Sequence, residues 1–295
     1  MISPKMLWFT GWASLCLICL TNVLPANDGF AASRFVPERK DDFAFENDKV
    51  AFRIYGPALK DSKENSGIDC WLKRVDYPII DKWYQGATEG QSYHKDHGEG
   101  YDPYNVNDSL GCGGLALWMD GQMHLSNVFQ EYRVLKNGPD EAVFEVKYGW
   151  EALPQPITET RRFTLVAESQ LFKAESQIFI DGKPAQVNVA AGVTTHNQKT
   201  MPNYSKDGSW VGAWETYGQS GLGTGVILGD ASKAKTLTIT SYENDRSHVI
   251  LITPTDINGR ISHYGGFGWE KAGVITTAGD WRNYLTQFSK HHPYK

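Results

Sequence analysis

The chain has 295 residues, with 29 Lys and Arg against 34 Asp and Glu, so its formal net charge is -5 at pH 7. A mildly acidic chain without runs of Lys or Arg argues against nucleic acid and against anionic membranes as partners. The length allows one large domain or two small ones.

The first 31 residues have the features of a secretory signal peptide. Lys5 precedes an apolar run from Leu7 to Leu20, and small residues around Ala31 suit a signal peptidase. The run is shorter than the roughly 20 apolar residues that a membrane span requires. We therefore predict a periplasmic or secreted protein, without a membrane span, whose single catalytic domain covers residues 32–295.

Strand patterns dominate the rest of the chain. Two hairpins are predicted, at 43–55 with a turn at Asn47-Asp48 and at 115–125 with a turn at Asp120-Gly121. Further strands are predicted at 132–135, 142–150, 161–166, 172–180, 186–195, 210–217, 225–228, 236–242 and 249–252. Strands at this spacing, without helical periods between them, predict an all-β fold, a large antiparallel β-sandwich.

One helix is predicted, at the C-terminus. Its apolar residues recur at helical spacing and Asp280 can cap its start; they are Trp281, Tyr284, Leu285 and Phe288. The segment from Gly56 to Gly114 is different, because it is rich in Gly, Asp, Tyr and His and shows little alternation. A long irregular segment in a compact domain is usually functional, so we expect the site there.

The predicted chemistry centres on a histidine pair in this segment. His94 and His97 are followed by Tyr101 and Tyr104. Imidazole titrates near neutral pH and can transfer protons in either direction, and a tyrosine can act as an acid when a nearby cation lowers its pKa. We predict that His94 or His97 transfers the proton, with both tyrosines beside it. His196, at the end of a predicted strand, is expected across from them.

Two alternatives for this loop stay open. The spacing of His94, His97 and Glu99 would also suit a divalent metal ion in a folded loop, although no other cofactor is indicated. A solvated, turn-rich loop with incidental histidines has the same composition.

Cations and aromatic residues lie together just before this loop. The predicted substrate-binding residues are Lys73, Arg74, Lys82, Trp83 and Tyr84. Flat rings bind the apolar face of a sugar and cations bind its carboxylate or sulfate, so this composition favours an acidic oligosaccharide as the partner. The alternative is a strand whose cations face water. Neither the oligomeric state nor a glycosidase carboxylate pair can be identified from the sequence.

The predicted mature chain keeps two cysteines, Cys70 and Cys112. An oxidising compartment would permit one disulfide bond between them. Two buried thiols are an equal alternative, because a free cysteine packs as a small apolar residue.

Five segments resemble a known bacterial family. They are 34–49, 66–69, 77–84, 93–100 and 111–114, and the family they resemble was once catalogued only as a domain of unknown function and occurs in polysaccharide-utilisation loci. The resemblance implies an oligosaccharide dehydratase of the ulvan pathway. Such an enzyme removes water from a non-reducing-end glucuronic or iduronic acid and leaves a 4,5-unsaturated uronic acid. The opening hairpin also resembles the β-supersandwich of galactose mutarotases and several polysaccharide lyases.

The implied reaction sets three requirements. The substrate carboxylate must be neutralised, because the C5 hydrogen is otherwise only weakly acidic. A base then takes the C5 proton and an acid protonates the departing O4 hydroxyl. A mutarotase- or epimerase-like sugar enzyme and a non-catalytic carbohydrate-binding protein remain the alternatives.

Overall fold

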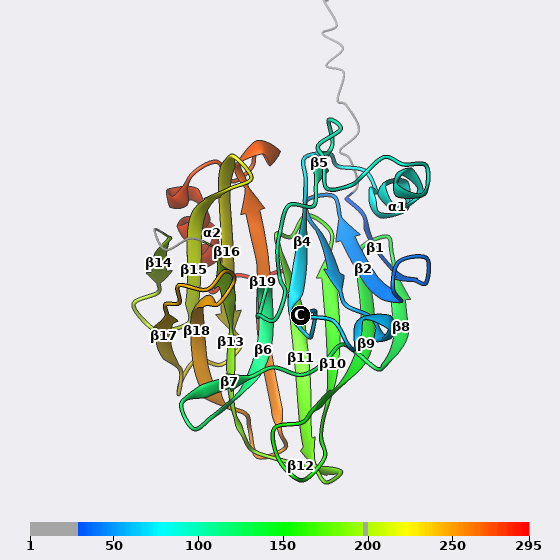
Figure 1. Ribbon diagram of the computed structural model, residues 1–295. Helices are drawn as coiled ribbons and strands as arrows, with labels where there is room; N and C mark the ends of the chain where they lie inside the picture. Colours follow the sequence, from blue (N-terminus) through cyan, green and yellow to red (C-terminus); the bar gives the residue numbers. More distant parts are fainter. Residues whose placement is uncertain (1–28, 197–199, 295) are drawn as a thin grey trace, which may run out of the picture.

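The computed structural model describes residues 29–196 and 200–294, which fold mainly into antiparallel strands (Figure 1). Residues 1–28 of the predicted signal peptide lie outside the described residues, and Ala31 is the first residue of strand β1. Within the described ranges, no helix is both long and apolar enough to cross a membrane.

A nine-stranded sheet forms one layer of the molecule. Its strands are β8 (Glu131–Asn137), β9 (Glu141–Trp150), β10 (Ile157–Val166), β11 (Leu171–Ile180), β12 (Lys183–Pro184), β14 (Met201–Tyr204), β15 (Trp210–Tyr217), β16 (Ser220–Leu228) and β19 (Arg260–Trp269). Their order is β14-β15-β16-β19-β11-β10-β9-β8, with β12 paired to β11. Residues of β9 and β10 alternate between buried and accessible, so one face of this sheet lies on the core and the other on solvent.

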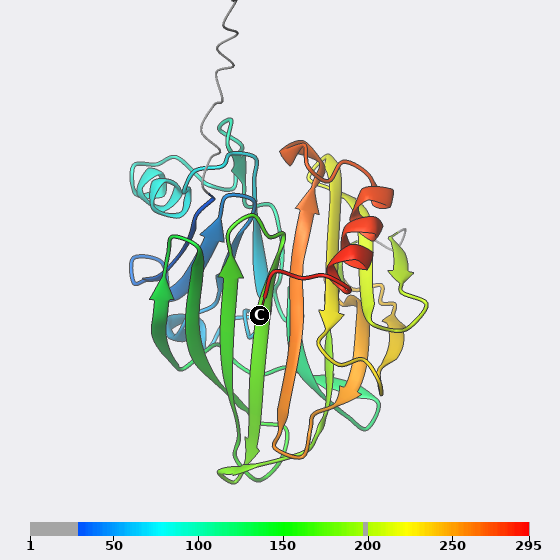
Figure 2. The ribbon, with the colours of Figure 1, turned by 180° about the vertical axis from the view of Figure 1, so that it is seen from behind.

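Two five-stranded sheets form the opposite layer. The first contains β1 (Ala31–Val36), β2 (Asp42–Asn47), β3 (Ala51–Ile54), β4 (Ile68–Lys73) and β5 (Gly100–Tyr101). The second, in the order β17-β18-β13-β6-β7, contains β6 (Cys112–Met119), β7 (Gln122–His124), β13 (Asn188–Thr195), β17 (Lys235–Ile239) and β18 (Ser247–Pro254). Both lie on the same side of the large sheet (Figures 1 and 2).

Aromatic and branched residues join the layers. Phe45 of β2 and Phe52 of β3 pack against Phe172 of the large sheet, with ring centroids 5.9 and 5.1 Å apart. Val193 of β13 and Val211 of β15 belong to a second core cluster under the other small sheet. The predicted antiparallel β-sandwich and both predicted hairpins are therefore confirmed.

Cys70 and Cys112 are both buried as free thiols. They belong to the same core cluster as Phe52. This placement corresponds to the second of the two alternatives, in which each cysteine packs as a small apolar residue.

The C-terminal helix α2 (Ala278–Phe288) packs against β15 and β16 of the large sheet (Figure 2). Trp281 and Leu285 are buried, as predicted, and Trp281 Nε1 donates to the carbonyl of Thr224 at 3.0 Å. The predicted cap is corrected: the Thr277 side chain caps the helix by accepting a hydrogen bond from the amide of Asp280, and the Thr277 hydroxyl donates to the Asp280 carboxylate at 2.8 Å.

A second helix, α1 (Ile80–Thr88), contradicts the prediction of a single helix. It has only nine residues and follows Pro78, so it offers too short a periodic pattern to distinguish from a loop. Ile80, Trp83 and Tyr84 bury its inner face against the outer face of the β1–β5 sheet. Two short 3-10 turns, Pro57–Leu59 and Glu270–Ala272, complete the regular structure.

The α2 cap gives a stability prediction. Thr277→Ala removes an acceptor for an otherwise unpaired helix amide, and we expect the free energy of unfolding to fall by about 1 kcal/mol. Thr277→Ser keeps the hydroxyl and should unfold at the wild-type urea concentration. An alanine variant as stable as wild type would show that the hydroxyl does not act as a cap.

Candidate active site

The loop between α1 and β5 carries both predicted proton-transfer histidines. His94 lies at its surface, with 59% of its side chain exposed, and its Nδ1 is 2.8 Å from the carbonyl oxygen of Asp102. Because a carbonyl only accepts, Nδ1 carries a proton, and Nε2 is the ring nitrogen left for a substrate. His97 instead directs Nε2 to the carbonyl of Ser92 in the same loop, 3.0 Å away. Of the two, His94 is the better placed to act as a base.

A buried ion network adjoins His94. Arg53 Nη2 is 2.5 Å from Asp69 Oδ2 and 3.2 Å from Asp102 Oδ2, and Arg53 Nε is 3.9 Å from Asp42. Asp102 Oδ2 is in turn 3.5 Å from His94 Nδ1. Burial raises the pKa of Asp69 and of Asp102, against the opposing charge of Arg53. The network therefore fixes Asp102, and Asp102 fixes the ring of His94.

Two predicted substrate-binding cations lie at the surface in ion pairs. Arg74 Nη2 is 2.8 Å from Asp96, and Lys82, whose side chain is 62% exposed, pairs with Glu99. A small cavity of about 40 Å³ lies beside the second pair and is lined by Lys82, Trp83, Gly86, Gln91, Tyr93, Lys95, His97, Glu99 and Gly100. This cavity has room for little more than water, which excludes it as the seat of a whole sugar ring.

Lys73 is placed differently from the prediction. It is fully buried, and its ammonium donates to Glu46 at 3.0 Å and to the carbonyls of Asn47 and Tyr77 at 2.8 Å. Glu46 also accepts the amides at the start of α1. Lys73 therefore anchors this helix and does not present a charge to a substrate.

The predicted stacking residues Trp83 and Tyr84 are also buried. Trp83 packs on Trp71 of β4 with ring centroids 5.5 Å apart, and its Nε1 donates to Glu99 at 3.1 Å. Tyr84 packs on the same Trp71 at 5.0 Å. Both rings hold α1 on the sheet, which leaves neither face open to a sugar.

The predicted metal ligands do not converge. His94 binds Asp102, His97 binds Ser92, and Glu99 binds Lys82 and Trp83. Among residues 29–196 and 200–294, no group of three His, Cys, Asp or Glu residues is arranged to hold a metal ion. The structure therefore does not bring these three residues together as a metal site.

The predicted His196 lies in a second polar centre. Its Nδ1 is 2.8 Å from Glu215 Oε1, and its Nε2 is 2.9 Å from the carbonyl of Asn105. Both partners are acceptors, so both ring nitrogens carry protons and the ring is an imidazolium. Burial opposes this charge, but the hydrogen bond and charge of Glu215 outweigh it and raise the pKa of His196.

Two tyrosines enclose this imidazolium. The ring centroids of Tyr104 and Tyr217 lie 4.5 and 4.3 Å from that of His196. Tyr217 OH donates to the carbonyl of Pro103, and burial raises its pKa. Tyr101 precedes Tyr104 in the chain, and its OH donates to the carbonyl of Gly218 at 2.8 Å. The structure thus brings Tyr104 together with His196, and separates both from His94.

A polar cleft of about 960 Å³ borders the His196 centre. It is lined by Lys60, Ser62, Lys63, Glu64, Asn65, Asn105, Asn107, Asp108, Leu125, Ser126, Asn127, Gly149, Glu151, Glu243, Asn244, Asp245 and Arg246. Asp245 links the cleft to the His196 centre. Its Oδ1 is 3.9 Å from His196 Nε2, and its Oδ2 accepts a hydrogen bond from Asn107 at 2.7 Å. The volume lies in the range of ligand-binding clefts.

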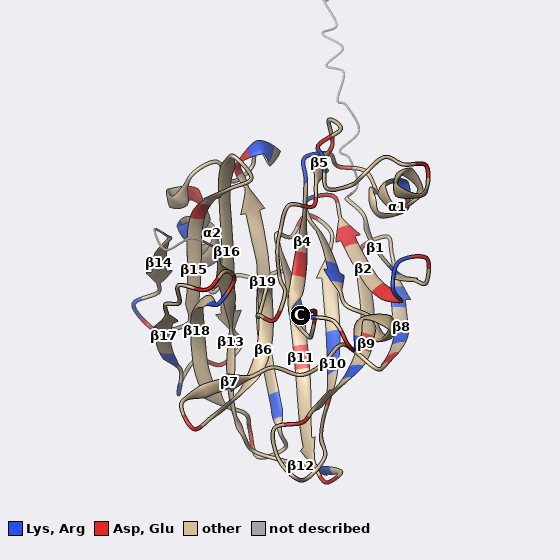
Figure 3. Ribbon diagram, in the orientation of Figure 1, with Lys and Arg blue, Asp and Glu red and all other residues tan. Residues whose placement is uncertain are grey.

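The cleft contains both cations and carboxylates. Lys60, Lys63 and Arg246 line it, and Arg246 pairs with Asp108 at 2.7 Å. Elsewhere on the ribbon Lys and Arg are dispersed among Asp and Glu (Figure 3). The same cleft is lined by five carboxylates, Glu64, Asp108, Glu151, Glu243 and Asp245, so its charge is mixed.

A model of the family described as "Domain of unknown function (DUF4861)" matches residues 20–293. The chain belongs to this family. A protein of Formosa agariphila named "Uncharacterized protein P7" is 34% identical over 272 residues, covering 88% of this chain and 67% of that protein.

Solved structures show a more distant likeness. A candidate aldose 1-epimerase from Klebsiella pneumoniae matches with a TM-score of 0.41 and 6% identity, over 88% of this chain and 87% of that chain. The galactosidase domain of an alpha-galactosidase-sucrose kinase matches with a TM-score of 0.40 and 8% identity, over 80% of this chain and 42% of that one. All of these names refer to carbohydrate enzymes, and at such TM-scores the likeness carries no argument about mechanism.

The raised pKa of His196 gives a pH prediction. A histidine that is more basic folded than unfolded stabilises the fold fully below its unfolded pKa of about 6.5, and this contribution is lost as pH rises through the folded pKa. We expect the difference in free energy of unfolding between wild type and His196→Gln to be largest below about pH 6.5 and to shrink as the pH rises above that value. Parallel curves for the two proteins would contradict a charged His196–Glu215 pair.

Proposed function

We propose that this DUF4861 protein is an oligosaccharide dehydratase. It removes water from a non-reducing-end uronic acid, such as the glucuronic or iduronic acid of ulvan-type oligosaccharides, and leaves a 4,5-unsaturated uronic acid. The observation that carries the proposal is the imidazolium of His196, held by Glu215 and enclosed by two tyrosines, with its Nε2 3.9 Å from Asp245 in the lining of a polar cleft. Family membership and the resemblance of five segments to a dehydratase family support it.

Each step has a residue in this cleft or, for His196, next to the cleft residue Asp245. Arg246, with Lys60 and Lys63 nearby on the lining, neutralises the substrate carboxylate. Asp245, the carboxylate beside His196 Nε2, accepts the C5 proton, and the electron pair of the C5–H bond becomes the C4=C5 double bond. As the C4–O4 bond breaks, His196 gives its proton to the departing hydroxyl, which leaves as water.

The hydrogen bonds that His196 makes in the free protein suit the role of a general acid. Its proton on Nε2 is held by the carbonyl of Asn105, a residue that also lines the cleft. A substrate hydroxyl that replaces this carbonyl would receive the proton without movement of the ring, since Glu215 keeps Nδ1 in place. Glu215 therefore orients the acid and stabilises its charge.

The decisive experiment is incubation with uronic-acid-terminated ulvan oligosaccharides. We expect ultraviolet absorbance from the conjugated product and a mass loss of one water without chain cleavage. A new reducing end would instead indicate a lyase or hydrolase. Binding without any change, across a panel of acidic oligosaccharides, would favour a carbohydrate-binding protein.

The second candidate is an epimerase- or mutarotase-like enzyme. The His196–Glu215 pair favours it, because interconversion of sugar forms also needs a histidine and a carboxylate at one carbon. Inversion at C5 or at the anomeric carbon, followed by nuclear magnetic resonance with no loss of mass, would identify it. We also propose export to the periplasm or the medium, which N-terminal sequencing of exported protein tests.

A further inference from the structure

The cleft beside His196 continues into a second hollow of about 680 Å³, because four residues line both: Lys60, Asn127, Gly149 and Glu151. The other residues that line this second hollow are Pro57, Val128, Phe129, Gln130, Trp150, Leu153, Pro154, Gln155, Pro156, Ile157 and Thr158. We call them the uncharged groove, since none of them has an ionisable side chain. Each of the two volumes lies in the range of small-molecule sites.

Charge distinguishes the two parts. The cleft is lined by Lys, Arg, Asp and Glu side chains. Beyond the shared Lys60 and Glu151, the uncharged groove offers apolar side chains together with the amides of Gln130 and Gln155 and the hydroxyl of Thr158. A ligand that fills both parts therefore carries its charge at one end and binds through C–H and hydroxyl groups at the other. An oligosaccharide that ends in a uronic acid has this form.

The floor of the uncharged groove is fixed by strands β9 and β10. Trp150, the last residue of β9, pairs in register with Ile157, the first residue of β10. The indole of Trp150 is buried, and its Nε1 donates to the carbonyl of His124 at 2.9 Å. Gln130 packs on Gly149 at the junction with the cleft, where a Cβ would lie only 2.9 Å from Gln130 Nε2. A preformed floor reduces the entropy lost when a ligand binds.

The loop between β9 and β10, residues 151–156, forms an apolar wall. Leu153 is 37% exposed, and Pro154 and Pro156 are exposed as well. The two proline rings restrict the backbone of the loop, and the carbonyl of Pro156 accepts the amide of Asp181 at 3.0 Å. Apolar side chains held in this way can cover the C–H face of a sugar ring and remove it from water.

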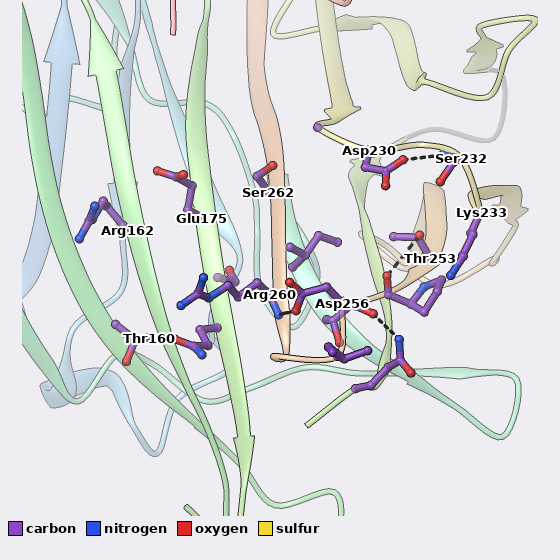
Figure 4. Close-up of a pocket in the computed structure, with 18 of the residues that line it drawn as sticks. Thr160, Arg162, Glu175, Asp230, Ser232, Lys233, Thr253, Asp256, Arg260 and Ser262 are labelled. Carbon is purple, nitrogen blue, oxygen red and sulfur yellow. Dashed lines mark hydrogen bonds between the residues drawn. The ribbon is translucent and has the colours of Figure 1, made fainter. Parts of the chain in front are cut away.

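Another groove, on the outer face of the large sheet, does not continue the cleft. Figure 4 shows that its charged residues include both signs, as in Glu175, Asp230 and Arg260. It shares no lining residue with the cleft or with the uncharged groove. A chain whose end lies in the cleft therefore continues into the uncharged groove and not onto that face.

We propose that the uncharged groove binds the sugar units that follow the terminal uronic acid of an oligosaccharide. The proposal rests on the proposed function, which places the terminal unit beside His196 and Asp245. The C–H faces of the following units pack on Leu153 and its neighbouring prolines, and the amides of Gln130 and Gln155 bind their hydroxyls. The groove thus favours a chain over a single uronic acid, and it does so without charge.

The test is titration calorimetry with a glucuronic-acid-terminated ulvan tetrasaccharide and with methyl glucuronide, which has no following unit. All proteins carry His196→Gln, which under the proposed function prevents turnover during the titration. We expect Gln130→Ala/Leu153→Ala to raise the Kd for the tetrasaccharide about tenfold, because it removes an apolar contact and an amide. The Kd for methyl glucuronide should stay the same.

The matched control is Gln122→Ala/Leu237→Ala. It removes the same two kinds of side chain from β7 and β17, where Gln122 is exposed and Leu237 is 37% exposed, outside both the cleft and the uncharged groove. This variant should bind both ligands as the parent protein does. An equal loss in the control would overturn the proposal, because the effect would then not belong to the groove.

Two other results would also overturn it. The first is an unchanged Kd for the tetrasaccharide in the groove variant, and the second is an equal loss for both ligands, since the groove would then not separate the first sugar from the rest. Calorimetry needs no turnover, so the two proposals can fail separately. Expected Kd values without dehydration by the wild-type protein would refute the reaction and keep the groove, whereas dehydration with an unchanged Kd in the groove variant would do the reverse.

Discussion

His196→Gln is expected to lower the turnover of a uronic-acid-terminated oligosaccharide by about 10²- to 10⁴-fold, the usual contribution of a positioned acid. Glutamine can still donate to Glu215 but has no proton to give to a departing hydroxyl. Because Arg246 and the cleft lysines are unchanged, KM should change much less than kcat. The measurement is the initial rate of ultraviolet absorbance.

Two variants make this result specific. His291→Gln removes an exposed histidine near the C-terminus and should retain full activity. His94→Ala tests the other centre, whose base is exposed and well held but lies apart from the large cleft. Full activity in His196→Gln together with a loss in His94→Ala would move the acid–base chemistry to the loop between α1 and β5.

Alternation found β10, which buries one face, but it did not find β4, which is buried on both. Strand β10 alternates strictly and was found from sequence, whereas β4 is buried along its whole length. A strand covered on both faces, here by the core and by α1, has no solvent side on which to place polar residues. Strand β19 was missed because Gly265, Gly266 and Gly268 interrupt its apolar pattern. Other segments of the same chain pack closely against these glycines.

The candidate site was only partly predictable for a similar reason. Composition located His94 and His196, but it could not separate a cation that faces a ligand from one that holds a helix, as Lys73 does. Glu215 was missed, although the sequence does hold a signal. Val211 and Ala213 precede it on the buried face of β15, so a carboxylate occupies a position where alternation predicts an apolar residue. A charge on a core face requires a buried partner, which is His196.

Arg53→Met is expected to lower the free energy of unfolding by about 3–5 kcal/mol at neutral pH, because it removes one partner from a buried ion network. Asp69 and Asp102 would then face each other without the cation that now lies 2.5 and 3.2 Å from them. Arg162→Met removes a half-exposed arginine from its pair with Glu145 and is the matched control, with an expected loss below about 1 kcal/mol. Urea unfolding measures both.

The pH dependence of this loss distinguishes charge from packing. Burial already raises the pKa of Asp69 and Asp102, and without Arg53 both should rise further. Groups with a raised folded pKa destabilise the fold above that pKa and cease to do so as pH falls towards the unfolded value of about 3.9. The deficit of Arg53→Met should therefore shrink on acidification, and Asp69→Asn should recover part of it at neutral pH. A deficit that is the same at every pH would mean that Arg53 acts through packing alone.

The Arg53 ion network is connected to the His196 centre by the backbone that follows Asp102. Arg53 holds Asp102, and the next three residues include Pro103, which accepts from Tyr217, and Asn105, which accepts from His196. Loosening Asp102 should therefore displace one wall of the His196 centre as well as the ring of His94. For that reason we expect Arg53→Met to lose turnover even under conditions where it remains folded, and Arg162→Met to lose none.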